Sequence, residues 1–404
     1  MFKKFLSALL CFAVAFTVTI SAFVQSGSID VQAASSVPLY LKYYYDQLDK
    51  DTQTIFLEMR DAVLNCDKKI TFEKEIDDEA FEKAEELLIF HEPMSFNVKD
   101  YFFDPEEPDT LIFKYKYKKD TYKKMISAYE KKVDNILAEM TDDMSRYRKI
   151  KTIHDAIINT AVYDLEAPNN GNLYGTLVEE QARCVGYAHT FSYICSKAGI
   201  QAVSVVGFDY PITNKNEMHM WNKVYYNKMW YNVDTTWDDP VNNLTDNLTY
   251  DYFMISDESM FRDHLEYNFS FEAPAAEDDS KAYYVMNNKY AEDLDSAKSI
   301  IKSSMKTAAK NDMAVISFQC SSYSVCKEVM AYLDSNDVAI VFEVVKYRTN
   351  KNLIDEIFSY SVNSGQYVVT MLIFYENTSL NKYYSDTTIL RNSTKSILKK
   401  YRIQ

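Results

Sequence analysis

A cysteine at the start of a predicted helix has the setting that a nucleophile needs. From Cys184 an apolar helical pattern continues through Phe191 and Ile194, and Gly199 is placed just past its end. The first turn of a helix offers unpaired backbone N–H groups and the positive end of the helix dipole, both of which favour a thiolate. The neighbouring Arg183 adds positive charge. The pattern therefore predicts a nucleophilic thiol at position 184.

A predicted β-hairpin supplies the other two catalytic groups. Residues 219–226 and 229–237 have the composition of strands, with a turn at Asn227-Lys228. A two-residue turn places His219 and Asp234 on one face as diagonal neighbours. A carboxylate there accepts the imidazole N–H and fixes its tautomer, while the other ring nitrogen faces the Cys184 thiol. We predict Cys184 as nucleophile, His219 as general base and Asp234 as the orienting carboxylate.

The sequence around these residues follows a family pattern. Its motifs are Tyr174-Gly175-Thr176-Leu177, Cys184-Val185-Gly186-Tyr187-Ala188, His219-Met220-Trp221-Asn222 and Trp230-Tyr231-Asn232-Val233-Asp234-Thr235-Thr236-Trp237-Asp238-Asp239-Pro240. Over about residues 145–265 the chain resembles the bacterial branch of the transglutaminase-like superfamily. The resemblance implies a papain-like α+β core that carries a Cys-His-Asp triad and acts on amide bonds through a thioester. Animal transglutaminases have Gln and Trp beside the nucleophile, where this chain has Arg183 and Val185.

Cysteines have a structural alternative to catalysis. A lone cysteine such as Cys184 is often a buried core thiol, and Cys195, eleven residues further along the same helix, is expected in the core. Cys320 and Cys326 are close enough for a small disulfide or for two buried free thiols. No Cys-x-x-Cys pair and no ligand spacing among the five histidines supports a zinc site. We therefore predict neither a metal nor a cofactor.

Other polar and aromatic residues near the motif have roles that the sequence leaves open. His154, His189 and His264 are expected outside the site, with His189 partly solvated on another side of its helix. Asp238 and Asp239 are expected as turn and capping acids before Pro240. Trp221 and Trp237 fit either the core or the wall of a cleft, and Tyr163 or Tyr174 could support an oxyanion beside the Cys184 backbone N–H.

The 404 residues suffice for two or three domains. Residues 34–140 mix helical and strand signals and are predicted to form an accessory α+β cap. Residues 141–273 are predicted as the catalytic domain, opened by a helix that Thr141 and Asp142 cap. Residues 280–404 are predicted as a small α/β domain, with strands at 283–286, 314–320, 338–345 and 367–375 and helices between them. The expected fold class is therefore α+β.

Residues 1–33 have the features of a signal peptide. Two lysines precede an uncharged stretch from Phe5 to Val24, and Val31-Gln32-Ala33 matches the pattern that signal peptidase cleaves. The alternative is an uncleaved N-terminal anchor, since the apolar stretch is long enough to span a bilayer. Either way, we expect a secreted or cell-surface protein.

Charge and location restrict the partners. The formal net charge of −15 makes nucleic acid an unfavourable partner. We expect a protein or peptide substrate, cell-wall peptide included, with membrane contact only through an uncleaved N-terminal segment. Peptide or isopeptide hydrolysis is the expected reaction, followed by amine transfer to Gln. A non-enzymatic binding module that uses the same cleft is the alternative of another class.

Overall fold

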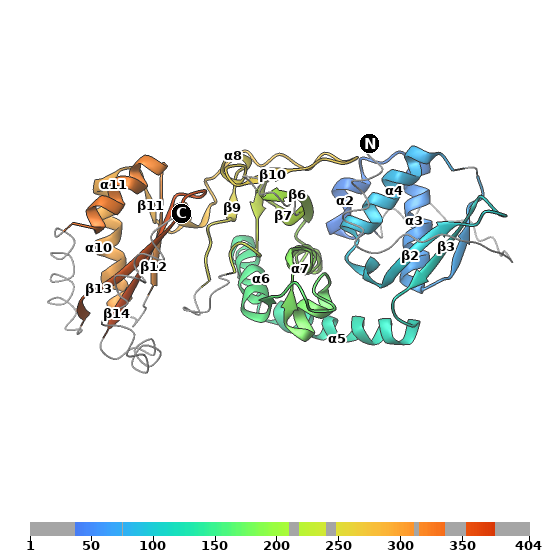
Figure 1. Cartoon of the computed structure of the whole chain (residues 1–404), viewed down its shortest axis with the longest axis horizontal. Helices are drawn as coiled ribbons and strands as arrows, with labels where there is room; N and C mark the ends of the chain where they lie inside the picture. Colours follow the sequence, from blue (N-terminus) through green and yellow to red (C-terminus); the bar gives the residue numbers. More distant parts are fainter. Residues whose placement is uncertain are drawn as a thin grey trace. The chain divides into compact units, whose positions relative to one another are not determined.

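The computed structural model describes residues 37–74, 76–209, 218–239, 248–310, 315–335 and 353–375. The chain divides into two compact units (Figure 1). The first comprises residues up to Val241 together with Asp263–Glu277, and the second comprises Asn242–Arg262 together with the chain from Asp278 onward. The predicted signal segment, 1–33, lies outside the described residues. Within the described ranges, no helix is both long enough and apolar enough to cross a membrane.

Helices and a small sheet form the N-terminal part of the first unit. The elements are α2 (Leu39–Tyr45), α3 (Lys50–Asn65), β1 (Lys69–Thr71), α4 (Asp78–His91), η3 (Pro93–Asn97), β2 (Val98–Phe103), β3 (Thr110–Tyr115) and α5 (Lys119–Ala138). The three strands pair antiparallel in the order β1-β3-β2. Asp49 caps α3 by accepting from the Thr52 N–H, and Asp77 caps α4 in the same way. The mixture of helices and strands predicted for this part of the chain is confirmed.

Hydrogen bonds from α2 join this part to the rest of the first unit. The Tyr44 hydroxyl donates to the Ser204 carbonyl at 3.0 Å, and the Leu39 N–H donates to Ser196 Oγ at 3.1 Å. Tyr44 is buried. The predicted cap, residues 34–140, and most of the predicted catalytic stretch therefore lie in one compact unit.

A second sheet and two helices form the remainder of the first unit. The elements are α6 (Arg146–Thr160), β4 (Val162–Tyr163), η4 (Gly175–Glu179), β5 (Gln181–Ala182), α7 (Cys184–Lys197), β6 (Ala202–Asp209), β7 (Met218–Tyr226), β8 (Met229–Val233) and β10 (His264–Glu266). Four antiparallel strands follow the spatial order β10-β6-β7-β8. The short strands β4 and β5 pair parallel to each other. Helix α7 packs against β6 and β7 (Figure 1), and its buried residues contribute to the core.

The start of α6 differs from the prediction. Ser145 caps the helix by accepting from the Arg148 N–H, whereas Thr141 and Asp142 lie one turn earlier. The Thr141 hydroxyl donates to Asp143 instead. The prediction of Thr141 and Asp142 as caps was wrong because a serine closer to the helix satisfies the first N–H groups.

The second unit is a mixed sheet with helices. Its elements are β9 (Phe253–Ile255), α8 (Asp257–Met260), α9 (Tyr283–Met286), β11 (Tyr290–Ala291), α10 (Leu294–Lys310), β12 (Val315–Cys320), α11 (Tyr323–Leu333), β13 (Leu353–Asn363) and β14 (Val368–Tyr375). Four of these strands form a sheet in the order β11-β12-β14-β13, in which β11 and β12 are parallel and the other pairs antiparallel. Its core includes Ile301, Phe318 and Val369.

Two predictions for the second unit were wrong. Residues 283–286 form a helical turn rather than a strand, because Tyr283 and Tyr284 accept helical hydrogen bonds through their carbonyls from Asn287 and Lys289. A strand, β13, occupies part of the stretch where a helix was expected, and it pairs with β14 along most of its length. The strand predicted at 338–345 lies outside the described residues.

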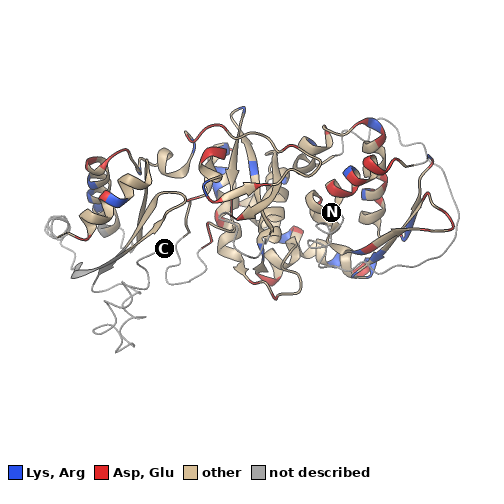
Figure 2. Cartoon of the chain, turned by 45° about the horizontal axis from the view of Figure 1, so that its top comes forward, with Lys and Arg blue, Asp and Glu red and all other residues tan. Residues whose placement is uncertain are grey.

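Figure 2 shows Asp and Glu interspersed with Lys and Arg along the ribbon of the described elements. The predicted catalytic residues lie on α7, on β7 and directly after β8.

Candidate active site

Cys184 is the first residue of α7. The preceding Arg183 has extended backbone angles and caps the helix without a side-chain hydrogen bond. Because Cys184 is the first helical residue, its N–H has no acceptor within the helix. The side chain is 8% exposed. Close packing holds this helix start, since a Cβ added at Gly186 would lie 2.3 Å from the carbonyl oxygen of Asn170.

His219 is the second residue of β7 and is buried. Its cross-strand partner on β6 is Gly207, and the Trp221 ring lies 2.6 Å from where a Cβ of Gly207 would be. Asn222, further along β7, donates through Nδ2 to the Ala188 carbonyl of α7 at 2.9 Å. This hydrogen bond fixes β7 against α7, so that His219 and Cys184 are held by two elements tied to each other.

Asp234 follows the last residue of β8. The predicted two-residue turn is confirmed: Asn227 and Lys228 both have positive φ, and Asn222 pairs with Val233. The prediction that the second strand continues to Trp237 was wrong, because the chain turns after Val233. Asp234 Oδ1 accepts the backbone N–H groups of Thr236 and Trp237, at 2.8 and 3.1 Å, and these bonds stabilise the turn.

The three predicted residues are brought together. His219 Nε2 lies 2.5 Å from Asp234 Oδ2, and the Cys184 thiol is a hydrogen-bond partner of the same ring. Since Nε2 donates to the carboxylate, the remaining nitrogen, Nδ1, is available to the sulfur. A neutral ring in this tautomer can take the thiol proton. The arrangement has the geometry of a nucleophile, a base and an orienting carboxylate.

Charge stabilises this arrangement. Burial disfavours a charged ring at His219, but the Asp234 carboxylate outweighs it and raises the pKa of His219 well above its ordinary value. Burial likewise opposes charge on Asp234, yet the adjacent imidazoles hold the pKa of this carboxyl below its usual range. The site therefore favours an ionised Asp234 beneath a protonated His219.

His264 is part of the site, although the sequence prediction placed it outside. Its Nε2 lies 3.2 Å from Asp234 Oδ2, the same oxygen that His219 contacts, and its Nδ1 lies 2.8 Å from Asp263 Oδ1. It stands on the three-residue strand β10, whose register pairs it with Asp209. The one local signal was an acidic residue directly before the histidine, which is too common to identify a site.

One cluster of side chains has the composition of a metal site: Asp209, His219 and His264. Each offers one ligand atom, and these atoms lie within 4.8 Å of one another. However, both nitrogens of His264 face carboxylates, and His219 faces Asp234 and Cys184. Both rings are therefore engaged in hydrogen bonds with other side chains of the protein.

Two further histidines have structural roles. His154 lies between two carboxylates, with Nδ1 3.0 Å from Asp155 and Nε2 3.1 Å from Asp238. This joins α6 to the turn that carries Asp234. The prediction of a partly solvated His189 was wrong, because its ring is buried and Nε2 is bonded to the Phe90 carbonyl at 2.9 Å.

The remaining candidates separate by position. Trp221 is buried and stacks beside His219, whereas Trp237 is 36% exposed and its ring centroid lies 4.5 Å from that of His264. Trp221 therefore belongs to the core, and Trp237 is partly exposed beside His264. Asp239 accepts a hydrogen bond from the Tyr187 hydroxyl, which anchors the far end of the same turn on α7. Cys195 is a buried free thiol, as predicted, and Cys320 and Cys326 are free thiols.

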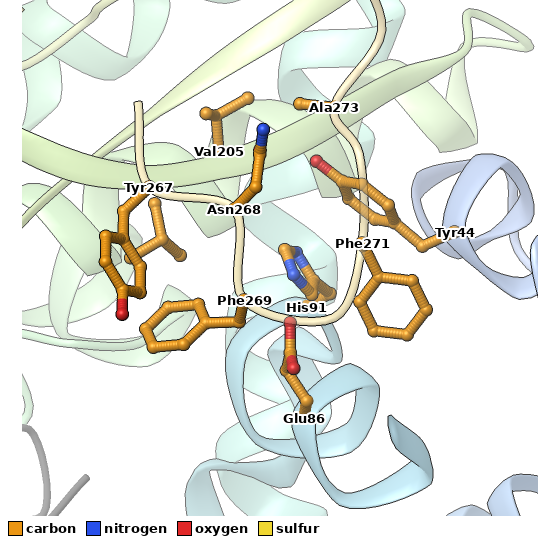
Figure 3. Close-up of a pocket in the computed structure, with 10 residues that line it drawn as sticks. Tyr44, Glu86, His91, Val205, Tyr267, Asn268, Phe269, Phe271 and Ala273 are labelled. Carbon is orange, nitrogen blue, oxygen red and sulfur yellow. The ribbon is translucent and has the colours of Figure 1, made fainter. Parts of the chain in front are cut away.

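A small cavity lies away from these residues. Figure 3 shows Phe269 and Phe271 beside His91, with Glu86 below them and Tyr44 opposite. The cavity measures about 10 Å³, which is about the room that one water molecule needs. Its lining includes none of the three predicted catalytic residues. We assign it to the packing between the N-terminal helices and β6.

The site lies in a transglutaminase-like stretch of the chain. Residues 134–235 match the Transglutaminase-like superfamily, and the matched stretch contains Cys184, His219 and Asp234. The chain thus carries a transglutaminase-like core within an α+β fold, which confirms the family resemblance and the predicted fold class.

Particular relatives are similar to part of the chain. Kyphoscoliosis peptidase of Mus musculus is 28% identical over 144 residues, which are 33% of this chain and 21% of that protein. The Homo sapiens protein of the same name is 26% identical over 162 residues, or 36% of this chain and 24% of its own length. The chain therefore spans less than a quarter of the length of these relatives.

Two solved structures are also similar. A transglutaminase (TGase) crystal structure has 17% identity and a TM-score of 0.26, covering 43% of this chain and 51% of that one. A candidate cysteine protease from Cytophaga hutchinsonii has 21% identity and a TM-score of 0.24, covering 30% of this chain and 43% of that one.

Proposed function

We propose that the chain is an exported cysteine acyl-transfer enzyme that hydrolyses peptide or isopeptide bonds at the cell surface or wall. The contact that carries the proposal is the shared ring of His219, which meets the Cys184 thiol on one side and Asp234 Oδ2 at 2.5 Å on the other. The name of the relatives, kyphoscoliosis peptidase, favours hydrolysis over other acyl transfers.

Each catalytic step has a residue to perform it. The Cys184 sulfur attacks the amide carbonyl after His219 takes its proton, and the N–H groups at the start of α7 face the developing oxyanion. The protonated His219 then donates to the leaving amine as the C–N bond breaks, which leaves a thioester on Cys184. Water, deprotonated by His219, attacks the thioester and releases the acid and the free thiol. Asp234 stays ionised throughout and orients the ring.

The proposal is tested with the full chain, an unfolded protein substrate and a labelled primary amine. Hydrolysis predicts new amino termini without stable label, because water resolves the thioester. Covalent incorporation of the amine into the substrate would overturn hydrolysis in favour of amine transfer. Absence of both products would favour the binding module.

Two variants assign the activity. C184A removes the nucleophile and should abolish both products. C66S is the matched control, since Cys66 is a free, half-buried thiol at the end of α3. Activity that survives in C184A, or that is lost in C66S, would contradict the assignment of Cys184 as the nucleophile.

A further inference from the structure

A second imidazole binds the carboxylate that orients the base. Asp234 Oδ2 faces His219 Nε2 at 2.5 Å and His264 Nε2 at 3.2 Å. The other nitrogen of His264 faces Asp263 Oδ1 at 2.8 Å. His264 is 1% exposed, so it has no surface to offer a substrate. Its contacts are made within the protein, and one of them is made to the triad.

The partners of His264 determine its charge. An ionised carboxylate only accepts hydrogen bonds, and an imidazole that donates from both nitrogens is an imidazolium. Burial opposes this charge, but Asp234 and Asp263 together raise the pKa of His264. Both contacts therefore favour the charged form of the ring, whose centroid lies 5.3 Å from that of His219.

Charged and titratable neighbours of this ring come from several strands of the sheet. Asp209 on β6 pairs directly with His264, His219 stands on the adjacent β7, and Asp234 follows β8. Asp263 precedes β10, and Cys184 lies beyond His219. Asp234, Asp263 and the two imidazoles are thus buried together, where a change in one charge affects the others strongly, while Asp209 lies at the exposed edge of this cluster.

We propose that His264 is a positioning residue for the acyl-transfer reaction: its charged ring, held by Asp263, fixes the Asp234 carboxylate under His219 and limits how strongly His219 retains its proton. The proposal rests on the proposed function for its effect on catalysis. Two like charges repel, so the His264 cation makes it easier for His219 to release its proton. A base held too tightly in the protonated form would be slow to accept the next proton.

Activity tests the positioning role. H264A removes both the hydrogen bond to Asp234 and the charge, and should lower kcat by about ten- to a hundredfold. KM should stay unchanged because the ring does not reach the substrate. H264Q places an amide N–H where Nε2 of the histidine stood. Measured at the pH optimum of this variant, its kcat should recover most of what H264A loses. Equal losses in H264A and H264Q, or a change confined to KM, would overturn the positioning role.

Titration of His219 tests the charge independently of any substrate. The chain has five histidines, so ¹³C-histidine NMR of the full chain can follow each ring. In H264Q the midpoint of His219 should move upward by about one pH unit, because the neighbouring cation is gone. D263N keeps the ring but removes the carboxylate that holds its second proton, and should move the His219 midpoint in the same direction.

The two readouts separate the possible failures. An unchanged His219 midpoint in both H264Q and D263N would overturn the proposal for His264 even if the chain is an active enzyme. If the His219 midpoint shifts in the two variants but the wild-type chain cleaves no amide bond, the proposed function is contradicted and the charge coupling remains supported. H264Q and D263N change little side-chain volume, so the test stands if H264A fails to fold.

Discussion

At the scale of single residues, the carboxylate of Asp234 is the centre of the site. One oxygen receives two backbone N–H groups of its own turn, and the other receives two imidazoles. A carboxylate that is satisfied on both oxygens is held in one orientation and stays ionised. The direction in which His219 faces Cys184 is therefore set by a residue that never touches the substrate.

Removing the charge of Asp234 should lower kcat far more than removing a neighbouring charge. D234N is expected to lower kcat by about a hundred- to ten-thousandfold, because the ring loses its orienting partner. D209N is the matched control: Asp209 lies near the same histidines but is exposed, so its loss should change kcat only slightly. Steady-state kinetics of both variants checks this. Similar effects of the two substitutions would show that general acidity of the pocket, rather than the Asp234 contact, sustains activity.

A histidine remote from the site should govern acid stability. His91 is buried against Ser204, and burial lowers its pKa to about 3. In the unfolded state His91 takes up a proton at its ordinary pKa, whereas in the folded state burial prevents this. The contribution of His91 to stability is therefore present above about pH 6.5 and is lost as the pH falls toward 3. The loss contributed by His91 approaches about 1.4 kcal/mol per pH unit in this window.

Urea unfolding of the wild type and of H91Q between pH 7 and pH 5 measures this contribution. H91Q should be less stable than the wild type at pH 7, and the difference should shrink as the pH falls. A constant difference over the whole range would mean that His91 does not take part in the acid effect.

At the scale of elements, Gly207 allows β10 and the Trp221 ring of β7 to pack closely against β6. A Cβ at this position would lie 2.2 Å from the Leu265 carbonyl oxygen and 2.6 Å from the Trp221 ring. G207A should therefore destabilise the fold by about 1–3 kcal/mol and displace His264 from Asp234. G199A is the control, since Gly199 has φ +71° and nothing within 4 Å of an added Cβ. It should cost about 1 kcal/mol through backbone strain alone.

Thermal unfolding and kcat of the two glycine variants separate these effects. G207A should lose activity beyond what its fraction of unfolded protein explains, while G199A should lose stability only. If G207A keeps full activity per folded molecule, then the close approach at Gly207 does not position the site.

Local patterns were sufficient to predict the elements that carry the triad. The helix that begins at Cys184 ends just before Gly199, and the hairpin turns at Asn227-Lys228. Both features could be predicted because residues adjacent in sequence specify them. The end of β8 could not be predicted, since Asp234 uses its own side chain to form a turn in a segment of strand-like composition.

His264 could not be predicted because its role depends on long-range pairing. It lies 30 residues from Asp234, on a strand of three residues that is defined only by its antiparallel pairing with β6. Short strands have no periodicity to recognise. The error at Tyr283–Met286 has a different cause: tyrosine and valine favour a strand, but local hydrogen bonds form a helical turn.

At the scale of the whole molecule, the candidate site lies entirely in the first compact unit. Cys184, His219, Asp234 and His264 all belong to it, together with the N-terminal helices. The second unit has its own core around α10, α11 and the sheet of β12 and β14. The chemistry proposed for the chain therefore needs no residue of the second unit.

Export is a prediction for the intact chain. Signal peptidase should cleave after Ala33, so that protein secreted by a bacterial host begins at Ala34. Intact mass and amino-terminal sequencing identify the start. A33R removes the small residue at the cleavage position and should leave the longer form in the membrane fraction. Secreted wild-type protein that keeps residues 1–33 would rule out this cleavage, and membrane retention of the wild type would indicate an anchor.

The central claim is that the His219 ring activates the thiol of Cys184, and thiol reactivity measures this most directly. Iodoacetamide labelling at pH 6, resolved by peptide mass spectrometry, compares Cys184 with Cys66 in the same molecule. The account predicts that Cys184 reacts at least about tenfold faster than Cys66 in the wild type, and that H219Q abolishes the difference. Equal rates for the two cysteines in the folded wild type, or a fast Cys184 that is unaffected by H219Q, would contradict it.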